Sequence, residues 1–189
     1  MSRPTDHSAN NPGRASRTES SMPRPMKSTR SLLALAGFGV ATAGVAWYAS
    51  RYSRKGSRGA WYRSLNKPSF NPPEKVFPVV WTSLYALMAW SGWRVWSAAP
   101  SRQRNAALRL WMSQLAANAK WSKLFFGEHR PVLALADIIA LEGAIFSYIN
   151  AARKVDRAAA NAFIPYAAWV AFATVLNAEF ARLNPHAAA

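Results

Sequence analysis

The segment WYRSLNKPSFNPP (residues 61–73) is a proline-stiffened aromatic loop that leads directly into an apolar stretch beginning at Phe77. Proline fixes the backbone angle φ and cannot continue a strand ladder, so Lys67-Pro68 and Pro72-Pro73 predict an ordered, extended turn. Tryptophan and tyrosine beside such a turn suggest a loop that rests on a membrane surface or covers a cavity. The loop therefore points to a membrane fold.

Apolar segments on both sides of the loop support this interpretation. A spanning helix needs about 20 mostly apolar residues, and segments of that length lie at about 31–50, 77–99, 106–126, 131–152 and 158–183. The sequence predicts an all-α membrane protein, a bundle of five transmembrane helices over residues 31–185, with a C-terminal tail at 186–189. Residues 1–30 are polar and basic, so we expect a disordered tail.

The N-terminal part of the chain has two other interpretations. Ala41-Thr42-Ala43 resembles a signal-peptide cleavage site, but the length of the first apolar segment and the interfacial pair Trp47-Tyr48 favour a retained helix. The Arg- and Ser-rich tail also resembles an organelle transit peptide, although its prolines disfavour an amphipathic helix. Lysine and arginine are shared almost evenly between the loops of the two sides, so the sequence leaves both orientation and membrane open.

The net charge of +16 would usually suggest a nucleic-acid partner. However, the basic residues lie mostly between the apolar segments, where membrane proteins meet lipid phosphates. These residues are Arg51, Arg54, Lys55, Arg58, Arg102, Arg104, Arg153, Lys154 and Arg157. We therefore expect membrane lipids and no nucleic acid as partners. The chain has no cysteine and only three scattered histidines, so no metal site is expected.

Charged side chains within the predicted spans should face one another, because unpaired charge in a membrane is costly. Lys120 or Lys123 is expected to pair with Asp137 or Glu142 of the next antiparallel helix. The alternative is that these charges form a polar patch for a ligand carboxylate.

Two helical faces are readable from residue spacing. Phe77, Trp81 and Tyr85 recur every four residues and share one face, which is either a packing seam or a ligand wall. Gln114 and Asn118 also lie four residues apart, and we expect them to form hydrogen bonds between helices.

Several motifs occur in order along the chain. They are Trp61-Tyr62, Leu65-x-Lys67-Pro68-x-Phe70-x-Pro72-Pro73, Trp81-Thr82-x-Leu84-Tyr85, Gln114-Leu115-x-x-Asn118-x-x-Trp121-Ser122-x-Leu124-Phe125-Phe126-Gly127, Ala134-Leu135-Ala136-Asp137, Pro165-Tyr166-x-x-Trp169-x-x-Phe172-Ala173-x-x-Leu176-Asn177 and Arg182-Leu183-Asn184. Together they resemble the translocator protein family (TspO/MBR), also called tryptophan-rich sensory proteins or peripheral-type benzodiazepine receptors. The resemblance covers about residues 31–185.

This resemblance implies a homodimer of five-helix bundles, each with a pocket under the loop between the first two helices. The implied ligands are porphyrins such as protoporphyrin IX or haem, bound as ligands and not as covalent cofactors, together with other lipophilic or amphipathic small molecules; some family members bind sterols and benzodiazepine-type drugs. Carried over by motif, the ligand-binding residues are Phe77, Pro78, Trp81, Tyr85, Asn118, Trp121, Leu133, Ala136, Trp169, Ala173 and Leu176. The lid would comprise Trp61, Leu65, Lys67, Pro68, Phe70, Pro72 and Pro73.

The chemistry of these residues agrees with the implied ligand. Indole rings provide flat faces on which a tetrapyrrole stacks while water is excluded. Arg63, Lys67 or Asn118 would bind the propionate groups. No histidine is placed for axial ligation of iron, which favours stacking that does not depend on a metal.

Three functions are compatible with these observations. The leading interpretation is a membrane receptor or transport-type protein with a sensing or tetrapyrrole-handling role. One alternative is a porphyrin-degrading enzyme in which Trp81 and Trp169 carry radical chemistry, although no acid, base or nucleophile cluster supports conventional catalysis. Another is a structural, partner-binding membrane protein. Ala178 stands where the animal sterol-recognition pattern has tyrosine, so cholesterol is not the expected principal ligand.

Overall fold

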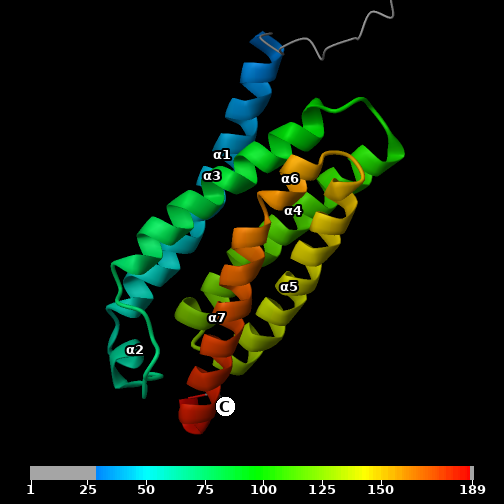
Figure 1. The fold of residues 1–189 in the computed structure, drawn as a ribbon. Helices are drawn as coiled ribbons and strands as arrows, with labels where there is room; N and C mark the ends of the chain where they lie inside the picture. The colour runs from blue at the N-terminus through cyan, green and yellow to red at the C-terminus, as the bar shows by residue number, and fades with distance from the viewer. Residues whose placement is uncertain (1–28, 188–189) are drawn as a thin grey trace, which may run out of the picture.

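The computed structural model describes residues 29–187, and this range is helical with no strand (Figure 1). Five long helices form its body: α1 (Thr29–Ser57), α3 (Val76–Ser97), α4 (Arg102–Ser122), α5 (Pro131–Arg153) and α7 (Ile164–Leu183). Shorter elements are α2 (Ala60–Ser64), the π-helical turn η1 (Lys123–Gly127), α6 (Arg157–Asn161) and the 3-10 turn η2 (Pro185–Ala187). The tail predicted at 1–30 lies outside the described residues except for its last two, and so do residues 188–189.

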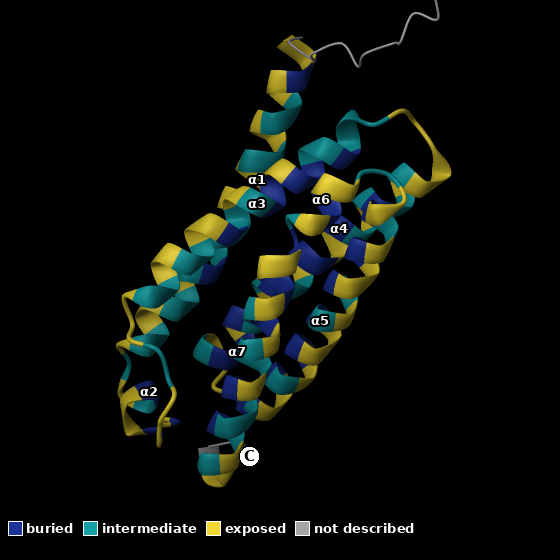
Figure 2. Ribbon diagram, in the orientation of Figure 1, coloured by how far each residue is buried: buried dark blue, intermediate teal, exposed yellow. Residues whose placement is uncertain are grey.

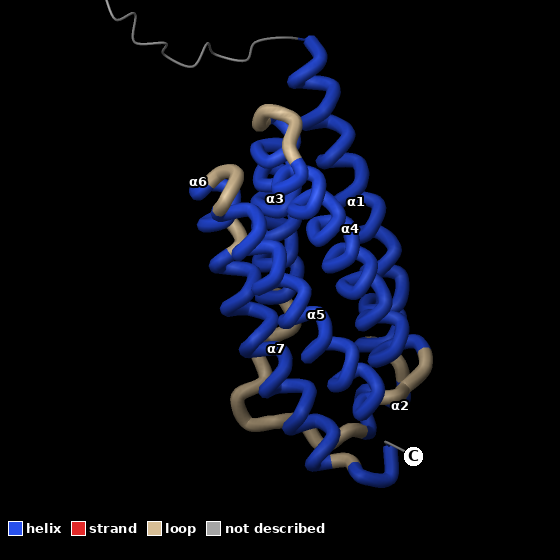
Figure 3. Tube along the Cα trace, turned by 90° about the vertical axis from the view of Figure 1, so that its right-hand side faces the viewer, coloured by secondary structure: helices blue, strands red, loops and turns tan. Residues whose placement is uncertain are grey.

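The long helices stand side by side, as Figures 1 and 3 show from two directions. α1 packs against α3 and α4, α4 packs against α5, and α5 packs against α7. The all-α membrane fold expected from the sequence is confirmed. Among the described helices, α1, α5 and the segment Arg157–Leu183 are long and apolar enough to cross a membrane. For α3 and α4, membrane crossing remains a prediction.

Three helices differ from their predicted bounds. The segment expected at 106–126 begins at Arg102 and changes at Lys123 into the π-helical turn η1. α1 continues to Ser57 instead of ending near Ser50, because Arg54 and Lys55 favour its last turn, where cations interact well with the helix dipole. The segment expected as one helix over 158–183 is divided by a turn at Ala162-Phe163. Pro165 explains the new start, since proline lacks a backbone N–H and fits the first turn of a helix.

Buried residues are frequent along α4, α5 and α7, whereas α1 is mostly exposed (Figure 2). Trp111 of α4 is 1% exposed, and its indole N–H donates to the Met88 carbonyl oxygen of α3 at 2.9 Å. Phe38 of α1 meets the Trp111 ring edge-on, with ring centroids 4.9 Å apart. Gly92 of α3 lies against both rings, so three helices meet at this glycine.

The predicted ion pair between the third and fourth long helices is confirmed for Lys120 and Asp137, whose Nζ and Oδ1 atoms are 2.9 Å apart. Lys123 instead pairs with Glu128, at 3.2 Å, because Lys123 begins the η1 turn and Glu128 directly follows it. Both carboxylate oxygens of Glu142 are buried without a hydrogen-bond partner among the described residues. The polar interior predicted from the sequence is therefore only partly paired.

Gly92→Ala should destabilise the bundle. A Cβ atom at this position would lie 2.6 Å from Cδ1 of Phe38 and 2.8 Å from Cε2 of Trp111. Because the buried Trp111 ring is held by its hydrogen bond, we expect a loss of about 1–3 kcal/mol in the free energy of unfolding. Denaturant titration in detergent, followed by circular dichroism, measures this loss.

Gly143→Ala is the matched control, since no atom lies within 4 Å of its added Cβ. It should leave stability unchanged or raise it by up to about 1 kcal/mol through helix propensity. Equal losses in the two variants would contradict close packing at Gly92.

Candidate ligand-binding site

An aromatic wall joins α3 to α7. Phe77 of α3 meets Trp169 of α7 edge-on with ring centroids 5.9 Å apart, and Trp81 meets Tyr166 in the same way at 6.2 Å. Trp81 also lies against Tyr85, one helical turn further along, at 5.5 Å. The face predicted on α3 therefore points toward α7 and forms one side of the candidate site.

The α7 side of the site follows from helical spacing as well. Trp169, Phe172, Ala173 and Leu176 recur at intervals of three or four residues and so share one face. The rings of Trp169 and Phe172 are 5.5 Å apart, and Phe70 of the α2–α3 loop reaches Phe172 at 6.4 Å. The loop thus extends the wall beyond the helix ends.

Asn118 forms the polar centre of the site. Its side-chain carbonyl accepts a hydrogen bond from the Tyr85 hydroxyl at 2.8 Å, and its Nδ2 donates to the Tyr166 hydroxyl at 2.9 Å. Asn118 is 4% exposed, so these bonds are made away from water. One amide on α4 therefore orients two rings of the aromatic wall, one on α3 and one on α7.

Trp121 connects the site to the end of the bundle that carries the loop. Its indole N–H donates to Oδ1 of Asn177 at 3.0 Å, and Asn177 donates in turn to the Pro131 carbonyl oxygen at 2.9 Å. The Trp121 ring stacks on Phe125 of η1 with centroids 5.3 Å apart. This chain of contacts links α4, α7 and the start of α5.

The first half of the predicted lid is anchored to the bundle. The backbone N–H of Asn66 donates to Oδ1 of Asn184 at 2.8 Å, and Nδ2 of Asn184 donates back to the Asn66 carbonyl oxygen at 3.0 Å. Trp61 stacks on His129 at 4.3 Å, and Leu65 is buried with Tyr62 in a cluster at the same end. These contacts tie residues 61–66 to η1 and to the end of α7.

The second half of the lid is less tightly held. Pro68 is buried, but Lys67, Phe70 and Pro73 are exposed and Pro72 is only half-buried. The Lys67 ammonium lies 4.8 Å from the centroid of the Tyr62 ring. A cation is therefore available at the edge of the loop, where a ligand carboxylate would meet solvent.

Tyr62 is suited to receive this cation. Burial, with a smaller contribution from the Glu74 carboxylate, raises the pKa of the Tyr62 hydroxyl above its usual value. A tyrosine hydroxyl is neutral at physiological pH even with its ordinary pKa, so the Lys67 contact is made to an aromatic face and not to a phenolate.

The structure does not gather all the predicted residues into one cluster. Leu133 and Ala136 are exposed on α5 and belong to neither buried apolar cluster, and Pro78 is exposed on α3. Within residues 29–187, no group of three or more metal-binding side chains occurs. The arrangement offers aromatic faces, hydroxyl and amide groups, and one cation, Lys67, at the edge of the loop.

Tyr166, Asn177 and Asn184 were absent from the predicted site. All three occur in the sequence motifs, and Tyr166 precedes Trp169 by three residues, which places the two near one face. That spacing was a usable signal for Tyr166. Asn184 carried no such signal, because its partner Asn66 lies 118 residues away.

Comparison with known proteins decides the family. The model of the TspO/MBR family matches residues 33–183, which is most of the chain. The chain belongs to the TspO/MBR family. It is 39% identical to the protein CrtK of Rhodobacter capsulatus over 130 residues, which cover 68% of this chain and 81% of CrtK.

Two further TspO/MBR relatives show the breadth of the family. The chain is 42% identical to the tryptophan-rich sensory protein of Cereibacter sphaeroides over 124 residues, covering 66% of this chain and 77% of that protein. It is 38% identical to the human translocator protein over 119 residues, covering 62% and 70%. Family membership and apolar helices make this an integral, multi-pass membrane protein with a sensory or transport-type role.

Asn184→Ala should loosen the 61–73 loop of this TspO/MBR protein without unfolding the bundle. The change removes both hydrogen bonds between Asn184 and the Asn66 backbone. Two such bonds contribute roughly 1.4 kcal/mol together, so amide exchange at Asn66 should become about tenfold faster. Hydrogen–deuterium exchange with mass spectrometry measures the peptide that contains Asn66.

Asn150→Ala, an exposed change on α5, serves as the control and should leave exchange in the loop unaltered. If exchange at Asn66 stayed slow in Asn184→Ala, the anchoring role of Asn184 would be refuted.

Proposed function

We propose that this protein binds porphyrins, such as protoporphyrin IX and haem, between α3 and α7 under the 61–73 loop. The observation that carries the proposal is the pair of inter-helix ring contacts, Phe77 with Trp169 and Trp81 with Tyr166. Aromatic rings provide large flat contact surfaces at low cost in conformational entropy. A flat tetrapyrrole is a ligand whose shape and polarisability match such surfaces.

Ring geometry supports insertion between the two helices. The contacts across the wall are edge-to-face, with interplanar angles of 76° and 66°. A planar ligand that enters between the rings would exchange these edge contacts for stacked contacts of larger area. Such an exchange requires the side chains to move. The ligand would enter at the second half of the loop, which is less tightly held than the first.

Polar groups support an amphipathic ligand over a purely apolar one. The hydroxyls of Tyr85 and Tyr166 meet at Asn118 on one side of the wall, and Lys67 lies at the loop edge. Propionates at the loop edge would pair with the cation, while the ring system lies among the aromatic side chains. For haem, the aromatic wall supplies stacking and no histidine ligand, so haem would bind through its ring system.

This ligand class fits the sensory or transport-type role of the family. Reversible binding under a loop would let the protein report tetrapyrrole levels or pass the ligand on. We also propose that it acts as a homodimer, which native mass spectrometry of the detergent-solubilised protein would show directly by its mass.

Trp81→Leu and Trp169→Leu should each weaken protoporphyrin IX binding. A lost aromatic contact is worth about 0.5–1.5 kcal/mol beyond its buried area, so the dissociation constant should rise roughly tenfold. Titration of the purified protein, followed by porphyrin fluorescence, gives this constant. The porphyrin signal is preferable because each substitution also alters tryptophan emission.

Trp90→Leu is the matched control, since Trp90 is on α3 but exposed and lies beside Arg94 instead of the wall. It should bind as the unmodified protein does. Unchanged affinity in both wall variants would reject the proposed site, and a complete lack of saturable binding would favour a partner-binding role.

The same titration under illumination distinguishes binding from degradation. Simple binding leaves the porphyrin absorption spectrum recoverable after extraction. A degrading enzyme would form a new absorbing product over many turnovers and would lose that activity in Trp81→Leu and Trp169→Leu.

A further inference from the structure

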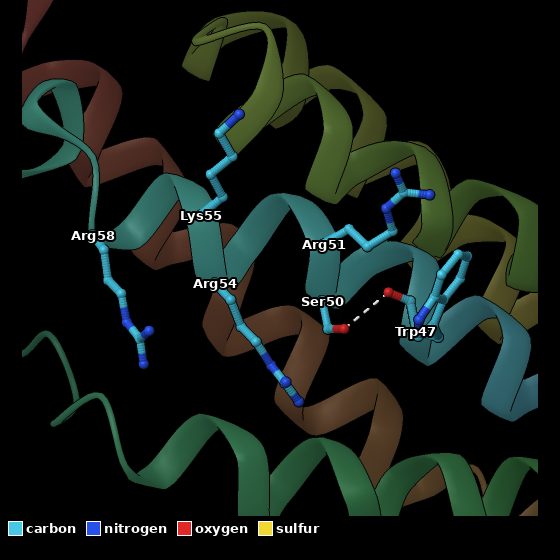
Figure 4. Close-up of a pocket in the computed structure, with 6 residues that line it drawn as sticks. All are labelled: Trp47, Ser50, Arg51, Arg54, Lys55 and Arg58. Atoms are coloured by element: carbon cyan, nitrogen blue, oxygen red, sulfur yellow. Dashed lines mark hydrogen bonds between the residues drawn. The ribbon is translucent and has the colours of Figure 1, made fainter.

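A basic groove lies at the C-terminal end of α1, and none of its lining residues belongs to the aromatic wall. Its volume is about 490 Å³, and it is lined by Trp47, Ser50, Arg51, Arg54, Lys55 and Arg58 (Figure 4). These positions recur at intervals of three or four residues, so they occupy one side of the helix and its following turn. We call these four cations, Arg51, Arg54, Lys55 and Arg58, the α1 basic cluster.

The α1 basic cluster has no counter-charge from the described part of the chain. The ion pairs within residues 29–187 use Glu128, Asp137, Asp156 and Glu179, and none of them involves the cluster. Figure 4 shows Arg51 and Lys55 extending to one edge of this helix face and Arg54 and Arg58 to the other, and all four line the groove. Four like charges on one groove repel one another, and an external anion relieves this repulsion.

Helix capping alone does not explain the cluster. Arg54 and Lys55 lie in the last turn of α1, where cations stabilise the helix dipole. Arg51 precedes that turn and Arg58 follows the helix, so neither benefits much from this effect. The cluster therefore has more charge than the helix end uses.

The position of the cluster places it at a membrane surface. Residues 31–50 carry no charged side chain, and 20 helical residues at 1.5 Å each span about 30 Å, the thickness of the hydrocarbon layer. Arg51, the next residue, therefore lies at the level of the lipid headgroups. Only 11% of the apolar part of α1 is buried inside the protein, so lipid has access to this helix from the side.

Trp47 strengthens the choice of lipid over a soluble anion. Its side chain is 63% exposed, and the Arg51 guanidinium lies 4.9 Å from the centroid of its ring. An exposed indole at the end of an apolar span is typical of the boundary between acyl chains and headgroups. The groove therefore combines an interfacial aromatic ring with cations that bind phosphate oxygens.

We propose that the α1 basic cluster binds the phosphate of an anionic phospholipid headgroup. The guanidinium groups would donate hydrogen bonds to the phosphate oxygens, while the acyl chains lie along the exposed apolar face of α1. This binding is separate from ligand binding under the 61–73 loop and does not depend on it.

Native mass spectrometry tests the proposal with the full chain. The detergent-solubilised protein is mixed with equal amounts of phosphatidylglycerol and phosphatidylcholine of identical acyl chains, and the bound lipids are counted. The unmodified protein should retain phosphatidylglycerol in preference to phosphatidylcholine. In the variant R51Q/R54Q/K55Q/R58Q, the ratio of bound phosphatidylglycerol to bound phosphatidylcholine should fall at least about tenfold. The reason is that each basic residue near a membrane surface contributes to anionic-lipid binding.

The matched control is R30Q/K75Q/R109Q/R130Q. It also removes three arginines and one lysine, all exposed and none in an ion pair within the described residues, and it should keep the preference. An equal loss in the control, or a retained preference in the cluster variant, overturns the proposal. Displacement of phosphatidylglycerol by inorganic phosphate at comparable concentration overturns the assignment to lipid in favour of a free-phosphate site.

Two further variants keep the test decisive if the fourfold variant does not fold. R54Q/R58Q should lose part of the preference while circular dichroism shows an intact helical content. The charge-conserving R51K/R54K/R58K should retain the preference, because the charges remain. Loss in the lysine variant equal to that in R54Q/R58Q, or no loss in R54Q/R58Q, overturns an electrostatic headgroup site.

Discussion

Hydrogen bonding at Asn118 is the interaction on which the arrangement of the candidate site depends. A polar side chain inside a membrane bundle has no water to bond with, so it must find partners on neighbouring helices. Asn118 finds them in Tyr85 and Tyr166, and both tyrosines belong to the aromatic wall. The need to satisfy one amide therefore fixes how α3, α4 and α7 present their rings.

Close helix packing complements this polar constraint. Where Gly92 lies against Phe38 and Trp111, the absence of a side chain lets α1, α3 and α4 approach one another. Small residues do this generally in membrane proteins, because lipid provides little hydrophobic drive for helices to associate. The aromatic wall lies on the same face of α3, nearer the start of the helix, because Trp81 and Tyr85 precede Gly92 by 11 and 7 residues. There, large side chains span the distance to α7.

The sequence predicted the helical class and most of the aromatic face, because both follow from local spacing. Phe77, Trp81 and Tyr85 share a face in any α-helix, and the Lys120 and Asp137 pair follows from two antiparallel neighbours. What spacing does not specify is the partner on a distant helix. The contact of Asn66 with Asn184 joins residues 118 positions apart, and the π-helical turn of η1 alters the direction of Phe125 and Phe126 in a way that a regular 3.6-residue period does not predict.

Glu142 marks another limit of reasoning from sequence. Both are acids on α5, yet Lys120 reaches only Asp137. Lys120 lies near the end of α4, opposite the start of α5, and Glu142 is five residues, about 7.5 Å, further along α5 than Asp137.

Uneven anchoring divides the 61–73 loop into a fixed arm and a free arm that meet at Asn66. The fixed arm is tied to Phe125 of η1 and to Asn184 at the end of α7, whereas beyond Asn66 the free arm reaches α7 through the Phe70 and Phe172 rings. A motion that preserved the fixed contacts would be confined to the residues beyond Asn66 and would separate the Phe70 and Phe172 rings. In that case the loop would open on the side of α7, while residues 61–66 would still cover the end of the bundle.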